Sequence, residues 1–291
     1  MRELDVTTPD GRTLRVLDAG PEDGAPVLVH NGTPNSRLLY GHDVERAEQQ
    51  GVRMISYDRP GYGGSTRLEG RSVADCAVDV RAIAAALQIE RLAVWGISGG
   101  GPHALACAAL LEDLVPAVGV LGSIAPWGAD GLDYFEGMGE LNVEDIKLAI
   151  ADKAAARAKC EADREAMLAA DAAGLTEQLI SLLSPVDAAV MTGEIGQYIV
   201  DCVQNGLAPG ADGWWDDAEA HLGPWGFELS AIRTPVLLMH GRQDRFVPFA
   251  HGQWLATQVP GVEAFLSEED GHLTLTAHHL DRLHAWLVER L

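Results

Sequence analysis

Short apolar segments alternate with segments of helical character along most of this chain, and this alternation limits the fold more than any other feature. The apolar segments are 26–30, 52–57, 91–96, 115–123, 236–239 and 262–266, and the helical segments are 36–50, 73–87, 102–111, 249–258 and 275–290. Helices supply the long connections that parallel strands need, so this order predicts a parallel sheet covered on both faces. Residues 3–18 add two short strands around the turn at Pro9-Asp10-Gly11. We therefore expect an α/β fold with a mostly parallel central sheet.

The alternation stops between residues 126 and 225. This stretch is rich in Ala, Asp and Glu, and it predicts helices near 143–157, 160–172, 175–183 and 185–204, with clusters of Gly and Trp after them. We interpret it as a helical insertion that forms a cap over the carboxyl edge of the sheet, because ligands bind at that edge in open parallel sheets. The chain then divides into a core, residues 1–125 and 226–291, and the helical insertion, residues 126–225.

The sequence Gly96-Ile-Ser-Gly-Gly100 matches the pattern G-x-S-x-G and lies between a predicted strand and a predicted helix. In that setting the serine occupies a sharp, strained turn that exposes its hydroxyl. The amides and the dipole of the helix that follows favour negative charge at this point. The pattern alone is a weak signal, but its place between strand and helix makes Ser98 the candidate nucleophile.

A serine hydroxyl needs a base to act as a nucleophile near neutral pH, and the base needs an acid to orient it. After this kind of turn the acid comes next along the chain and the histidine last. Asp244 follows the segment 236–239, and His272 lies between the segment 262–266 and the last helix, so both occupy the expected loops. Asp270 is too near His272 in sequence to brace it from behind. His103, inside the helix that follows Ser98, is expected to be structural. The other histidines considered are expected to be surface or packing residues: His240, His251, His278, His279 and His284.

Negative charge that develops on a substrate oxygen needs two backbone amides to stabilise it. One belongs to Gly99, the residue after the nucleophile, and the other lies in the loop after the segment 26–30. Together these features resemble the α/β-hydrolase fold family, and within it the esterases, lactonases and proline-iminopeptidase-like enzymes.

The loop of that family usually reads His-Gly-x-Pro. Alignment of Gly32-Thr-Pro34 with it implies that Thr33 supplies the second amide, and it places Asn31 where the family's histidine usually stands. The sequence from Asp58 to Ser65 resembles the family's D-x-x-G-x-G-x-S signature, which is largely structural.

The resemblance predicts a serine hydrolase that uses Ser98, His272 and Asp244 and needs no metal or cofactor. We expect it to cleave a small carboxylic ester or lactone through an acyl-enzyme. Serine at the elbow argues against epoxide hydrolases and haloalkane dehalogenases, which use aspartate there. A carbon–carbon bond hydrolase, a cofactor-free haloperoxidase and a non-enzymatic receptor for a small ligand stay open as alternatives.

A proline-iminopeptidase-like aminopeptidase is a further alternative, because such enzymes hold the substrate's amine with acidic residues of the insertion. The available candidates are Glu136, Glu140, Glu144 and Glu194. However, the chain lacks the loop and elbow sequences typical of those enzymes, so ester or lactone cleavage ranks ahead.

The substrate pocket is the least readable part of the sequence. Its candidate residues are Asn31, Trp127, Tyr134, Met138 and Trp215, with ordinary core packing as the alternative for the aromatic ones.

The formal net charge is −22, and the helical insertion carries 19 acidic against 5 basic residues. This charge predicts that nucleic acids are repelled and that neutral or cationic substrates are favoured. Four cysteines show no metal-ligand spacing, the N-terminus has no apolar signal segment, and no apolar stretch is long enough to span a membrane. We expect a cytoplasmic protein with reduced thiols and no membrane partner.

Overall fold

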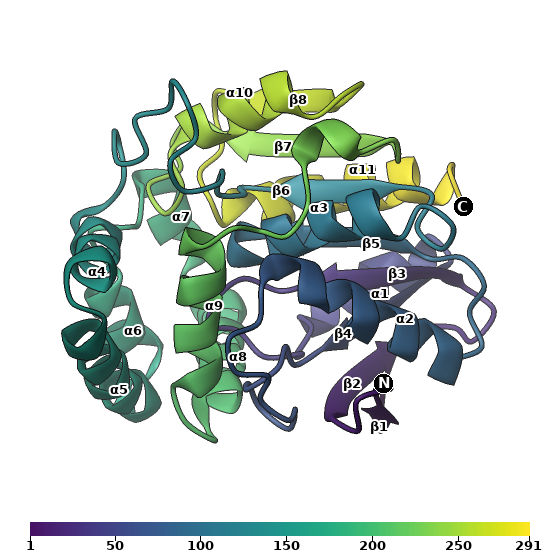
Figure 1. The fold of residues 1–291 in the computed structure, drawn as a ribbon, viewed down its shortest axis with the longest axis horizontal. Coiled ribbons are helices and arrows are strands. Elements are labelled where there is room, and N and C mark those ends of the chain that lie inside the picture. The colour runs from purple at the N-terminus through teal and green to yellow at the C-terminus, as the bar shows by residue number, and fades with distance from the viewer.

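A computed structural model describes all 291 residues, and its centre is an eight-stranded sheet in the order β1-β2-β4-β3-β5-β6-β7-β8 (Figure 1). The strands are β1 (Arg2–Thr7), β2 (Thr13–Ala19), β3 (Ala25–His30), β4 (Val52–Tyr57), β5 (Ala93–Ile97), β6 (Val118–Leu121), β7 (Val236–Gly241) and β8 (Glu263–Ser267). Only the pairings β1–β2 and β2–β4 are antiparallel, and the five others are parallel. The predicted mostly parallel sheet is therefore confirmed.

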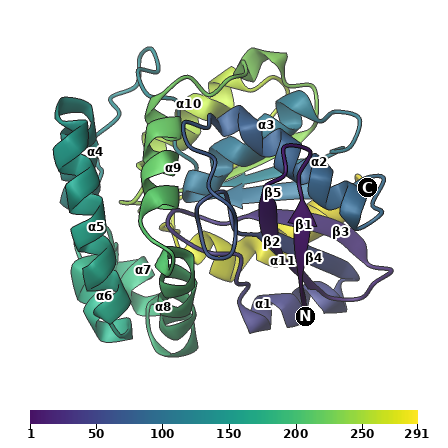
Figure 2. The ribbon, with the colours of Figure 1, turned by 60° about the horizontal axis from the view of Figure 1, so that its bottom comes forward.

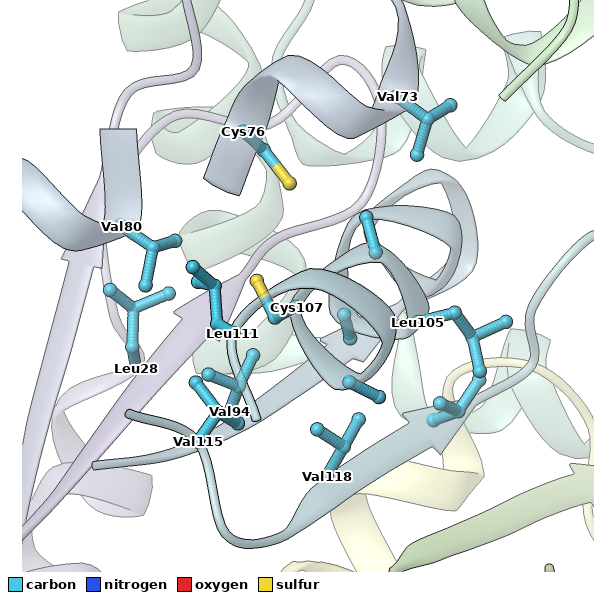
Figure 3. Packing of buried hydrophobic residues seen from close by; sticks show 14 of the residues in the cluster. Leu28, Val73, Cys76, Val80, Val94, Leu105, Cys107, Leu111, Val115 and Val118 are labelled. Atoms are coloured by element: carbon cyan, nitrogen blue, oxygen red, sulfur yellow. The ribbon is translucent and has the colours of Figure 1, made fainter. Parts of the chain in front are cut away.

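Helices cover both faces of the sheet, as its buried strands require. One face carries α2 (Cys76–Ala86), α3 (Gly101–Leu110) and α10 (Phe249–Gln258), and the other carries α1 (Gly41–Gln49) and α11 (Thr274–Val288). Figure 3 shows the first of these layers, where Val80, Cys107 and Leu111 lie among the valines of the strands. All four cysteines are free thiols.

Six helices stand between β6 and β7 in the chain and form the helical insertion. They are α4 (Glu140–Ala151), α5 (Lys153–Ala169), α6 (Ala172–Gln178), α7 (Pro185–Val190), α8 (Gly193–Leu207) and α9 (Asp212–Leu222). Both ribbon views place α8 and α9 nearer the sheet and α4, α5 and α6 on the outside (Figures 1 and 2). None of the helices in the chain has both the length and the apolar character needed to cross a membrane.

Several predicted helix boundaries are wrong, each for a local reason. The helix predicted from residue 36 begins at Gly41, because residues 31–40 form a loop held by the Asn31 side chain. The break predicted near residue 158 falls at Asp152, whose carboxylate accepts hydrogen bonds from Ala154 and Ala155 and so starts α5. The helix predicted over 185–204 is two helices, α7 and α8.

The helix α9 was not predicted, because its Gly and Asp residues have low helix propensity. Trp215 is buried against Ala149 of α4 and Ala156 of α5, and this packing within the insertion outweighs the weak local preference.

Candidate active site

Ser98 occupies the turn that joins β5 to α3, and its φ angle is +56°. Residues other than glycine rarely adopt this left-handed backbone conformation, and such backbone strain is concentrated at functional sites. A Cβ at Gly96 would collide with the Gly100 carbonyl, and one at Gly100 would collide with the His30 carbonyl. The two glycines of the motif are therefore required by the close approach of the backbone around the serine.

Asp244 and His272 meet at the ends of β7 and β8. His272 Nδ1 donates a hydrogen bond to Asp244 Oδ2 at 2.6 Å, and both side chains are buried. The other carboxylate oxygen accepts from the Val247 amide at 2.8 Å, and the Phe246 ring stacks on the imidazole with centroids 4.7 Å apart. These contacts fix the plane and the tautomer of the ring, so that Nε2 is the nitrogen free to accept a proton.

The pKa of His272 reflects opposing influences. Burial lowers the pKa, but the negative charge of Asp244 and its hydrogen bond raise it, with a further contribution from the charge of Asp187. The net effect raises the pKa above its ordinary value. The imidazole is therefore a stronger base than a free histidine.

Gly122 shows where this pair lies relative to Ser98. It follows β6, the strand between β5 and β7, and a Cβ there would stand 3.0 Å from His272 Nδ1 and 3.2 Å from Asp244 Oδ2. The pair thus lies over the end of β6, beside the strand that carries Ser98. No hydrogen bond joins Ser98 Oγ to His272 in this structure, so their direct contact belongs to the proposal below.

The loop after β3 lies on the other side of Ser98, where a Cβ at Gly32 would come within 3.3 Å of the serine Cβ. A Cβ at Gly99 would collide with the Thr33 side chain. The structure therefore brings together the segments of Thr33 and Gly99, the two amides assigned to the oxyanion.

Arg59 and Asp217 hold that loop, and no pattern in the sequence pointed to Asp217. Arg59 donates to the carbonyls of Asn31 and Gly32 and to Thr33 Oγ1, and Thr33 Oγ1 in turn donates to Asp217 Oδ2 at 2.7 Å. Asp217 lies on α9, so the helical insertion is tied directly to the predicted oxyanion loop.

Asp217 is fully buried and pairs with two guanidinium groups, Arg59 at 2.6 Å and Arg71 at 2.7 Å. Tyr62 donates a further hydrogen bond at 2.8 Å. Burial alone would raise the pKa of Asp217, but the two positive charges outweigh it and hold the pKa well below its ordinary value. The carboxylate is therefore charged near neutral pH.

Two histidines support the turn from behind. His103 Nδ1 and His221 Nε2 each donate to the Gly99 carbonyl at 3.0 Å. Burial lowers the pKa of both rings, that of His221 to about 4, so both are neutral near pH 7. His103 was expected to be structural, whereas His221 was not considered from the sequence.

The side chains predicted to line the substrate pocket have the following surroundings in the structure. The Asn31 amide donates to the carbonyls of Ser36 and Leu38, and Trp215 packs inside the insertion. Trp127 lies on the rings of Tyr134 and Phe135 with centroids 5.0 and 5.7 Å away, and Met138 is half-buried nearby in sequence.

The acidic candidates for an amine site are dispersed. Glu136, Glu140 and Glu144 are exposed, and Glu194 lines a cavity of about 520 Å³ with Tyr40 and Tyr198. Neither Ser98 nor His272 lines that cavity.

Three groups of side chains lie close enough to share a metal ion: His30, Cys76 and Cys107; His103, Asp217 and His221; and Asp270, His278 and His279. In the second group Asp217 already faces Arg59 and Arg71, whose charges would oppose a cation. None of the three includes Ser98 or His272.

Comparison with known proteins defines the class. A family model of the alpha/beta hydrolase fold matches residues 25–277, and the chain belongs to this family. It is 27% identical over 276 residues to the AB hydrolase superfamily protein YisY of Bacillus subtilis (strain 168), covering 92% of this chain and 91% of that protein.

It is also 25% identical over 247 residues to the bifunctional esterase/perhydrolase DCH of Acinetobacter calcoaceticus, covering 84% of this chain and 83% of that protein. The structure of an esterase from Exiguobacterium antarcticum has the same fold, with a TM-score of 0.68 at 21% identity over 99% of this chain and 98% of the other. The protein is therefore a hydrolase-family enzyme built on the α/β-hydrolase fold.

Proposed function

We propose that this protein is a serine hydrolase that cleaves a small carboxylic ester or lactone through an acyl-enzyme. The observation that carries the proposal is the pairing of His272 with Asp244 at the end of the sheet where Ser98 occupies a strained turn. The esterase activity named for the Acinetobacter relative supports the proposed cleavage of an ester.

In the proposed reaction His272 Nε2 takes the Ser98 proton as Oγ attacks the carbonyl carbon of the substrate. The amides of Gly99 and Thr33 stabilise the oxyanion, and Asp244 stabilises the imidazolium. The tetrahedral intermediate collapses, the bond to the leaving oxygen breaks, and that oxygen takes the proton from His272. Water then attacks the acyl-enzyme with His272 as base, which releases the acid and restores Ser98.

Covalent labelling with a fluorophosphonate, together with turnover of p-nitrophenyl acetate, tests the nucleophile. The wild-type protein should label and turn over, and the Ser98→Ala variant should do neither. Ser123→Ala is the matched control, because Ser123 is a buried serine at the end of the neighbouring strand β6. Equal labelling of the wild type and the Ser98→Ala variant would refute the assignment.

A substrate panel tests the bond that is cleaved. Short-chain esters and lactones should be hydrolysed, and proline p-nitroanilide should not. Cleavage of the anilide alone would favour the aminopeptidase, and labelling without turnover of any ester or lactone would favour the receptor.

A further inference from the structure

Asp187 lies on α7 of the helical insertion, 85 residues before His272, yet its carboxylate binds the backbone of the loop that carries this histidine. Oδ2 accepts a hydrogen bond from the His272 amide at 3.0 Å. Oδ1 accepts from Leu273 at 2.8 Å and from Thr274 at 3.3 Å. One carboxylate therefore satisfies three consecutive amides at the start of α11, which have no partners within their own helix.

The environment of this carboxylate is unusual for an aspartate. Asp187 has no exposed surface, and every partner is neutral: the three amides and the Ser184 hydroxyl, which donates to Oδ2 at 2.7 Å. Burying a carboxylate without a cation costs free energy, because the charge loses its hydration. Here the hydrogen bonds and the positive end of the α11 dipole offset that cost.

The Asp187 carboxylate is in close contact with the backbone of the loop. A Cβ at Gly271 would collide with the Asp187 carboxylate, so the glycine before His272 is required by the contact. On its other side the loop is tied to the loop of Asp244, because the Gln243 amide donates to the Asp270 carbonyl at 2.9 Å. The histidine backbone is thus held from the core by Gln243 and from the insertion by Asp187.

We infer that Asp187 is a positioning residue for the catalytic base: it fixes the backbone of His272 from the helical insertion and places a negative charge near the imidazolium that forms during catalysis. The inference rests on the proposed function. It makes the insertion part of the catalytic machinery, since one of the groups that hold the base lies on α7.

A second property distinguishes this role from simple helix capping. The groups that face His272 are Asp244 at Nδ1, Asp187 at its backbone, the uncharged ring of Phe246, and His240, whose Nε2 is 3.5 Å from Asp244 Oδ2. Burial lowers the pKa of His240, so this ring is neutral and the charges near His272 are the two carboxylates. The charge of Asp187 raises the pKa of His272, and its removal must lower that pKa.

The test compares Asp187→Asn with the wild type in kcat, in KM and in the pH profile of kcat/KM with p-nitrophenyl acetate. We expect kcat to fall about 10-fold or more with KM changed less than about 3-fold, because a displaced base slows the chemical step more than binding. The acidic limb of kcat/KM should move to lower pH. Asp201→Asn, an exposed aspartate on α8, makes the same change of charge elsewhere in the insertion and should leave both readouts unchanged.

Ser184→Ala keeps the experiment decisive if Asp187→Asn does not fold. This variant removes the hydroxyl that holds Asp187 but keeps the charge, so kcat should fall by less than about 10-fold from the wild-type value and the acidic limb should stay in place. A folded Asp187→Asn protein with wild-type kcat and an unshifted acidic limb would overturn the inference, and so would a Ser184→Ala protein with a shifted limb.

Titration of the His272 ring by NMR separates this inference from the proposed function, because it needs no substrate. A lower His272 pKa in Asp187→Asn supports the charge coupling even in a wild-type protein that hydrolyses no ester, a result that would refute only the proposed function. An identical His272 pKa in the wild type and in Asp187→Asn would refute the role inferred for Asp187 and would leave the proposed function unaffected.

Discussion

At the scale of single residues, the site depends on glycines as much as on its polar side chains. Gly122 has a φ of +49° and lies against the His272–Asp244 pair, where a Cβ would approach both partners closely. The Gly122→Ala variant should therefore lose about 10-fold or more in kcat, because displacement of the base by a fraction of an ångström disturbs proton transfer. Steady-state kinetics with p-nitrophenyl acetate, alongside circular dichroism of the folded protein, measures the effect.

Gly128→Ala is the matched control for this prediction. Gly128 also has a positive φ, +75°, but nothing lies within 4 Å of a Cβ at that position. Both variants carry a similar backbone penalty of about 1 kcal/mol, and only Gly122→Ala presses on the pair. Equal kcat values for the two variants would show that the contact with His272 is unimportant.

The predicted site residues were found from sequence motifs and from their order along the chain. Such patterns reflect the course of the backbone. Ser98 has the strained turn that its motif implies, and Asp244 and His272 meet as their loops suggested. The roles of Asp187 and Asp217 were not predicted, because an aspartate in an acidic segment is expected to lie on the surface. In the structure both are fully buried. Their roles depend on partners many residues away, which no local pattern encodes.

At the scale of elements, a buried ion cluster around Asp217 is one of the links between α9 and the core. Replacement of Asp217 by Asn would leave Arg59 and Arg71 buried without their counter-charge. We expect the free energy of unfolding to fall by about 3–5 kcal/mol, as for other buried pairs that lose one partner. We also expect kcat to fall, because Thr33 and the oxyanion loop lose their anchor. Urea denaturation and esterase assays measure the two effects.

The neighbouring residue supplies the control. Asp216 also lies on α9, but it pairs with Arg67, whose side chain is 30% exposed. Asp216 itself is buried, but Arg67 keeps its contacts with solvent and with Asp212 when Asp216 is replaced, so no guanidinium is left buried without a counter-charge. Asp216→Asn should therefore cost less than Asp217→Asn, about 1 kcal/mol, and leave kcat nearly unchanged. A larger loss of stability in Asp216→Asn than in Asp217→Asn would contradict the anchoring role.

Helical periodicity located most elements but misplaced their ends. The core helices follow the predicted segments because each presents an apolar face to a strand layer. Inside the insertion, helices pack on one another as well as on the sheet, and their breaks are set by caps such as Asp152 and by buried side chains such as Trp215. Those contacts arise only after the helices assemble.

At the scale of the whole molecule, acidification acts through two opposing effects. A net charge of −22 makes the protein repel itself, and this repulsion weakens as carboxylates become protonated. Buried histidines act in the other direction. Burial lowers the pKa of His221, His251 and His284 to about 4 in the folded protein, against about 6.5 in an unfolded chain.

A lowered folded-state pKa means that the unfolded chain takes up the proton first as the pH falls. The stability linked to each such histidine is therefore complete above about pH 6.5 and is lost between about pH 6.5 and 4. His284 isolates this effect, because it is fully buried, neither ring nitrogen has a hydrogen-bond partner, and it lies outside the proposed site.

The His284→Leu variant should consequently lose less stability than the wild type when the pH falls from 6.5 to 4.5. The expected difference between the two losses is roughly 2 kcal/mol, from one proton over about two pH units. Urea denaturation at several pH values measures it, with His42→Leu as the control, since His42 is exposed at the start of α1. Parallel stability curves for His284→Leu and the wild type would mean that protonation of this buried imidazole does not limit the stability of the fold in acid.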